Sequence, residues 1–176
     1  MRDWNVVATV RDGQYRHARD VLRSACGAAE RTEFYNVLVA KTDDLTGLME
    51  RIAGDERARS LFSRVVPLTS TFVFQRPQEL DEAAALAAAE LAPALAGRSF
   101  HVRFHRRGFK GSVRSIDEER RLSEVLLRAT SELGEPARLS FEAPDAIVVV
   151  ETVGNRGGIS LWTREQLERW PLLHLD

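Results

Sequence analysis

A strongly basic segment lies in the second half of the chain, between Arg98 and Arg114. It contains five arginines, one lysine and no aspartate or glutamate, so its charge is +6. Because the chain of 176 residues has a net charge of −1, the residues outside this segment carry −7. A local basic site on an acidic protein steers an anionic partner to one face. The other interpretation is a solvated charged strand followed by a flexible turn.

The residue pattern within this segment predicts a strand and a loop. Apolar residues at 100, 102 and 104 alternate with histidine or arginine at 101, 103 and 105, which is typical of a strand with one apolar and one basic face. Gly108 and Gly111 bracket the loop that follows, and glycine lets a backbone approach a phosphate closely. Phe109 is expected to stack on a base or ribose.

Eight side chains are predicted to bind RNA. Phosphate contacts by basic side chains give affinity and register without reading the base sequence. Arg156 lies in a glycine-rich turn and Arg164 begins the last helix, and both are expected near the basic loop. The eight residues are Arg103, His105, Arg106, Arg107, Lys110, Arg114, Arg156 and Arg164.

Two other functions remain open. A small enzyme acting on an anionic substrate would use His101 or His105 as a general base. A protein-interaction module would use the basic loop to bind an acidic partner. Glu151, at the end of an apolar run, is expected to pair with a nearby arginine rather than to act as a base.

The first 75 residues read as β-α-β-α-β, an open α/β arrangement that lacks one strand of a β-α-β-β-α-β unit. A boundary is expected at Arg76–Pro77. After it, Ser115 and Glu118 fit a capping box at the start of a helix. The main elements expected are strands at 5–10, 34–40, 65–74, 99–106, 146–153 and 159–162, and helices at 14–26, 79–96, 115–133 and 164–169.

The run FHVRFHRRGFKG, residues 100–111, resembles the signature strand and loop of the THUMP domain. The segments 139–145, 147–151 and 157–160 and a closing helix from Thr163 follow in the order of that family. The resemblance covers residues 77–170. It implies an α/β (α+β) fold in which a ferredoxin-like domain, residues 1–75, precedes a THUMP RNA-binding domain, residues 76–176.

The resemblance also implies a function. THUMP proteins bind tRNA, chiefly its acceptor stem and 3′ end, and present it for modification. The chain resembles the stand-alone adaptors of tRNA cytidine acetylation, so we expect no enzymatic activity and a separate tRNA-modifying enzyme as a partner.

The catalytic groups of the other family types are not found in the sequence. A methyltransferase needs a glycine-rich turn for its cofactor, but neither the turn at 108–111 nor the turn at 154–158 matches G-x-G-x-x-G. A deaminase needs a zinc site with two cysteines, and this chain has only Cys26. We therefore expect no catalytic residues, no cofactor and no metal. One cysteine and a longest apolar run of seven residues lead us to expect a cytoplasmic protein without a membrane partner.

Overall fold

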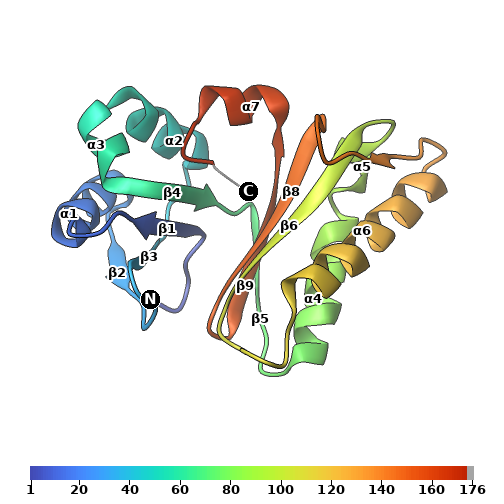
Figure 1. The fold of residues 1–176 in the computed structure, drawn as a ribbon, viewed down its shortest axis with the longest axis horizontal. Coiled ribbons are helices and arrows are strands. Elements are labelled where there is room, and N and C mark those ends of the chain that lie inside the picture. The colour runs from blue at the N-terminus through green and yellow to red at the C-terminus, as the bar shows by residue number, and fades with distance from the viewer. Residues whose placement is uncertain (174–176) are drawn as a thin grey trace. The chain divides into compact units, whose positions relative to one another are not determined.

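The computed structural model describes residues 1–173, which form two compact units (Figure 1). The first unit comprises residues 1–68 and 165–173, and the second comprises residues 69–164. No helix of the described residues is long and apolar enough to span a bilayer.

The compact units differ from the predicted domain ranges 1–75 and 76–176, which remain a prediction. Residues 69–75 belong to the second unit because the strand among them pairs in its sheet, and most of the last helix belongs to the first unit. Residues 174–176 of the predicted second domain lie outside the described residues.

The first unit contains a four-stranded antiparallel sheet in the order β2-β3-β1-β4. Its β-α-β-β-α-β order, with one additional helix, is the order of ferredoxin-like units. Asp44 caps the second helix, because its carboxylate accepts a hydrogen bond from the Gly47 N–H at 2.8 Å. The elements are β1 (Val6–Val10), α1 (Tyr15–Cys26), β2 (Ala29–Arg31), β3 (Val37–Ala40), α2 (Leu45–Gly54), α3 (Glu56–Leu61), β4 (Phe62–Pro67) and α7 (Arg164–Arg169).

The second unit contains a five-stranded sheet in the order β5-β9-β8-β6-β7. β6 runs parallel to β8 and β7, whereas β9 is antiparallel to β8 and β5. The two longer helices, α4 and α6, lie together beside this sheet (Figure 1). The elements are β5 (Ser70–Val73), α4 (Pro77–Ala89), α5 (Ala92–Leu95), β6 (Ser99–Arg107), α6 (Ser115–Glu132), β7 (Arg138–Leu139), β8 (Ala146–Val153) and β9 (Arg156–Thr163).

The prediction of an α+β fold is confirmed, and three elements differ from their predicted form. The expected strand at 65–74 is two strands in different sheets, β4 ending at Pro67 and β5 beginning at Ser70. The expected helix at 79–96 is divided into α4 and α5. Ser115 is the first residue of α6 rather than its cap, and no side chain caps that helix.

Candidate nucleic-acid interface

β6 has the two faces that its alternating sequence predicts. Phe100, Val102 and Phe104 are buried in the core of the second unit, where the helices α4 and α6 also contribute side chains. Glu119 of α6 accepts a hydrogen bond from the Phe104 N–H at 2.9 Å. His105 stands opposite Glu151 in the parallel pairing with β8. The strand therefore holds Arg103 and His105 on the face away from α6, and both are half-buried.

Arg107, the last residue of β6, forms an ion pair with Glu151 of β8. The Glu151 side chain is completely buried and that of Arg107 is 14% exposed. The predicted pairing of Glu151 with an arginine is confirmed. Arg107 therefore compensates a buried carboxylate, and one of the six positive charges of the basic segment is neutralised within the fold.

The loop after β6 is held in place by its own backbone and by Phe109. Gly108 has φ of 106°, and a Cβ at this position would lie 3.3 Å from the Cα of Gly154, so a side chain would be strained there. Arg106 donates a hydrogen bond to the Gly108 carbonyl. The ring of Phe109 packs against Phe74, with 5.3 Å between the ring centroids. Phe109 therefore packs on the core rather than standing free to stack on a base, which corrects the expectation.

The remaining loop cations extend into solvent. Lys110 is exposed, and no ion pair of Lys110 is found among residues 1–173. Arg114 is 74% exposed and lies 3.4 Å from Asp117 on the first turn of α6. An exposed pair of this kind contributes little to stability, so the Arg114 guanidinium can exchange this partner for a phosphate.

Arg156 lies at the same end of the sheet as the loop. The register aligns Arg107 of β6 with Val153 of β8, and Val153 with Arg156 of β9, so the two arginines share one cross-strand row on the two strands that flank β8. The Arg156 Nη2 donates a hydrogen bond to the Thr71 hydroxyl at 2.5 Å. The fold therefore brings together the end of β6, the loop and Arg156.

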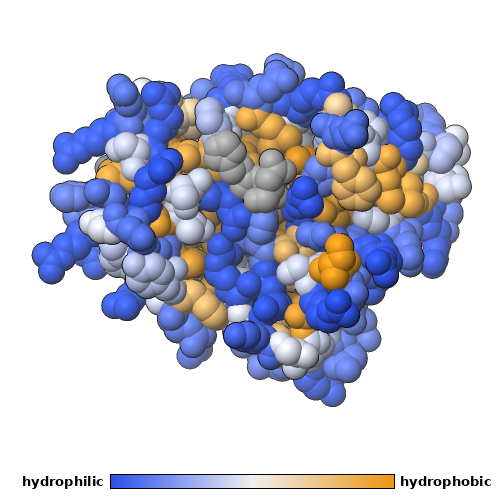
Figure 2. All heavy atoms as spheres, in the orientation of Figure 1, coloured by the Kyte–Doolittle hydropathy of each residue, from blue (hydrophilic) through white to orange (hydrophobic). Residues whose placement is uncertain are grey.

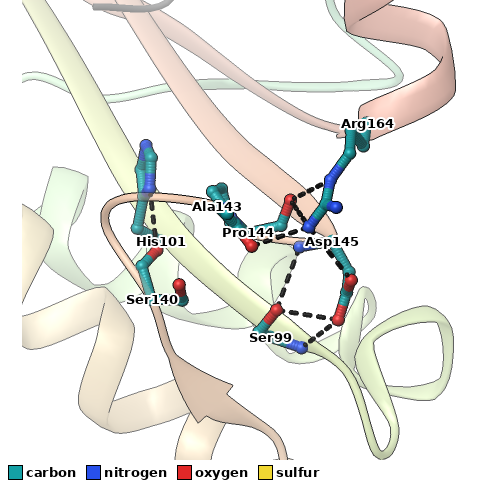
Figure 3. A network of polar contacts seen from close by, with 7 residues as sticks. All are labelled: Ser99, His101, Ser140, Ala143, Pro144, Asp145 and Arg164. Atoms are coloured by element: carbon teal, nitrogen blue, oxygen red, sulfur yellow. Dashed lines mark hydrogen bonds and ion pairs between the residues drawn. The ribbon is translucent and has the colours of Figure 1, made fainter.

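Arg164 lies at the opposite end of the sheet, which corrects the expectation that it approaches the loop. β9 is antiparallel to β8, so Arg164 follows the end of β9 beside the start of β8. There it donates hydrogen bonds to the carbonyls of Ala143, at 2.6 Å, and Pro144, at 3.0 Å (Figure 3). Arg164 therefore fixes the segment before β8 and does not contribute charge at the loop.

Asp145 completes this second cluster. Its carboxylate accepts hydrogen bonds from the N–H of Ser99, at 2.9 Å, and from the Ser99 hydroxyl, at 2.7 Å (Figure 3). These two hydrogen bonds, and then the charge of Arg164, hold the pKa of Asp145 below its ordinary value. The cluster ties the start of β6 to the start of β8.

His101 is 2% exposed, which was not evident from the alternating pattern of the strand. Its Nδ1 lies 3.1 Å from the Ser140 carbonyl, and its ring stacks on that of Phe141 with 5.8 Å between the centroids (Figure 3 shows His101 and Ser140). A buried imidazole held in this way is not placed to act as a general base on an external substrate.

Phe141 itself is 68% exposed, and Figure 2 shows apolar side chains near the start of β6 on a largely hydrophilic face.

Cys26 is not an activated nucleophile. Burial raises the pKa of its thiol to about 11, so the thiol is protonated at neutral pH. Among residues 1–173, no group of three or more histidine, cysteine, aspartate or glutamate side chains could hold a metal ion.

Comparisons with known proteins find likeness at the level of structure. No family model and no curated protein matches the chain. TrmN from Thermus thermophilus matches over 90% of this chain and 45% of its own, with 23% identity and a TM-score of 0.66. A 4-thiouridine synthetase in complex with RNA and ATP matches over 92% of this chain and 42% of its own, with 13% identity and a TM-score of 0.58.

A third match is a predicted N6-adenine-specific DNA methylase from Listeria monocytogenes. It covers 90% of this chain and 40% of its own, with 16% identity and a TM-score of 0.55. These likenesses show the fold. The chain spans about half the length, or less, of these solved chains.

The expectation that the protein is not an enzyme is wrong. Its fold recurs in chains named as methylases, and a further match named as a methyltransferase was solved with SAH. The missing cofactor loop was a weak argument, because this chain corresponds to only 40–41% of those chains. The remaining residues of those methylase and methyltransferase chains have no counterpart in this sequence.

Proposed function

We propose that the chain is a tRNA-binding unit that serves a tRNA modification reaction. The observation that carries the proposal is the basic end of the second sheet, where the half-buried Arg106 and Arg156 lie at the strand ends and the exposed Lys110 and Arg114 lie on the loop that follows β6. The fold shared with a 4-thiouridine synthetase that was solved with RNA supports it. Phosphates of the acceptor stem and of the 3′ end are the proposed ligands.

Methyl transfer is the reaction class that we propose for the bound tRNA. The recurrence of this fold in chains named as methylases and methyltransferases favours it. A separate tRNA-modifying enzyme as partner, acting in the cytoplasm, is part of the proposal. Purification of the tagged chain from its own cells, with identification of the proteins and RNA that accompany it, tests this part.

Binding of purified tRNA tests the function itself. We expect binding to tRNA with its terminal CCA to be tighter than binding to the same tRNA trimmed by these three nucleotides. Unstructured polyanions such as heparin should compete poorly, because the shape of the tRNA contributes to recognition. Equal binding to intact and trimmed tRNA, with efficient competition by heparin, would indicate a general polyanion-binding surface and would contradict the proposal.

A further inference from the structure

A cavity in the first unit lies apart in sequence from the basic loop. Its volume is about 290 Å³, close to the lower end of the range for small-ligand sites. Three of its six lining residues are aromatic and one is an arginine. We call it the aromatic pocket, and it is lined by Tyr15, Arg31, Glu33, Phe34, Tyr35 and Asn36.

An exposed aromatic ring stands at this pocket. Tyr35 is 81% exposed, yet its hydroxyl donates a hydrogen bond to the Asp12 carboxylate at 3.2 Å. Asn36 adopts φ of 54° and donates a hydrogen bond to the same carboxylate oxygen at 2.5 Å. A ring that is fixed at its polar end and open to solvent on its faces is a suitable surface for stacking.

Cationic side chains surround Tyr15 at the same pocket. The guanidinium of Arg31 lies over the Tyr15 ring, 5.9 Å from its centroid. Arg19 lies one turn along α1 from Tyr15, on the same side of the helix. Burial raises the pKa of Tyr15, and the charges of Arg31 and Arg19 oppose this shift, as expected for two neighbouring cations.

Two polar atoms, one on the pocket residue Tyr15 and one on the neighbouring Arg19, have unused hydrogen-bonding capacity. The Tyr15 hydroxyl and the Arg19 Nε are buried, and neither has a hydrogen-bond partner among residues 1–173. A buried polar group without a partner lowers stability, so each such group requires an explanation. A bound ligand with hydrogen-bonding groups of its own would provide one.

We propose that the aromatic pocket binds one unstacked nucleotide of single-stranded RNA, with its base on Tyr35 and its phosphate at Arg31. Aromatic side chains with a nearby arginine are the usual means of holding an unstacked base, since every base has a face on which to stack. The carboxylate of Glu33 can accept hydrogen bonds from a base amino group, which favours adenine and cytosine over uracil. This inference rests on the proposed RNA-binding function and adds a second contact site to it.

Two variants of the full-length chain separate stacking from other effects of Tyr35. Tyr35→Ala removes the ring, whereas Tyr35→Phe keeps the ring and removes only the hydrogen bond to Asp12. The probe is a five-nucleotide oligoadenylate, with binding measured by fluorescence anisotropy. Because one stacked base is worth about 1–3 kcal/mol, Tyr35→Ala should weaken binding about five- to 150-fold. Tyr35→Phe should bind within about twofold of the parent, and oligouridylate should bind the parent more weakly than oligoadenylate.

Ultraviolet crosslinking locates the bound base independently of affinity. Crosslinked oligoadenylate should be found by mass spectrometry on the peptide that contains Phe34 and Tyr35. If the oligonucleotide binds but crosslinks only within residues 69–164, and Tyr35→Ala binds as the parent does, the pocket proposal is overturned while the proposed function stands. If neither oligonucleotide nor tRNA binds, the proposed function fails and this inference fails with it.

Discussion

At the scale of single residues, the positive charges of the basic segment have different roles. Arg107 is paired with a buried glutamate of the neighbouring strand, whereas Lys110 and Arg114 are exposed at the loop. The sequence shows how many cations the basic segment holds. It also shows that Glu151, at the end of an apolar run, has a carboxylate that needs a cationic partner. It does not show which of the arginines will pair with it, because that pairing joins residues 44 positions apart.

The first prediction concerns Arg107. Arg107→Ala leaves the Glu151 carboxylate buried without its cation, so the free energy of unfolding should fall by about 3–5 kcal/mol. Arg114→Ala is the matched control, because it removes an exposed arginine of the same segment and should change stability by less than about 0.5 kcal/mol. Chemical denaturation monitored by circular dichroism measures both variants.

A double variant shows whether the buried charge is the cause. Arg107→Ala with Glu151→Gln removes both the arginine and the buried carboxylate charge, and should be more stable than Arg107→Ala alone. Equal stability of the parent and Arg107→Ala would mean that water reaches Glu151, and the structural role given to Arg107 would be wrong.

The second prediction concerns Cys26. With the pKa of the thiol raised to about 11, only about one thiol in a thousand is ionised at pH 8, so alkylation by iodoacetamide should be slow in the folded protein. The rate should rise about tenfold per pH unit up to pH 10 and should increase sharply on unfolding in urea. Rapid alkylation of the folded chain at pH 7 would contradict the burial of this side chain.

At the scale of elements, the strands with a regular pattern were predictable and the irregular ones were not. β6 alternates apolar and polar residues and β8 begins with an apolar run, residues 146–150, so both were located from the sequence. β2 has only three residues, two of them exposed, and shows no recognisable periodicity. Only two residues lie between β4 and β5, and the pairing of each with a different sheet is what separates them.

The third prediction concerns the cluster that joins the starts of β6 and β8. The lowered pKa of Asp145 means that its ionised form is favoured in the folded state. This contribution to stability is present above the ordinary carboxylate pKa and is lost as the pH falls through the lowered value. Asp145→Asn should therefore reduce the Tm clearly at about pH 7 and much less at about pH 2. Asp117→Asn, at an exposed carboxylate, is the control, and a Tm difference for Asp145→Asn that does not depend on pH would contradict this account.

At the scale of the whole molecule, the distribution of charge says more about an anionic partner than the net charge does. The net charge of −1 gives no sign of a nucleic-acid partner, while one segment carries +6. The fold places most of that charge toward one end of the second sheet, but it neutralises Arg107, and Arg98 lies before the start of β6, at the other end. About four cations then remain at the loop end for binding phosphates. A reaction of the proposed RNA ligand was not predictable from this chain, because the chains that share its fold are about twice as long.

The dependence of tRNA binding on salt concentration tests the central claim most directly. If four phosphates are bound, log K should fall against log salt with a slope of about −3 to −4. Lys110→Ala combined with Arg114→Ala should keep the fold, reduce this slope to about −1.5 to −2 and weaken binding at moderate salt. Arg57→Ala, at an exposed arginine of the first unit, should bind as the parent does. A slope near zero for the parent, or an unchanged slope and affinity in the double variant, would show that the basic end of the second sheet is not the RNA-binding surface.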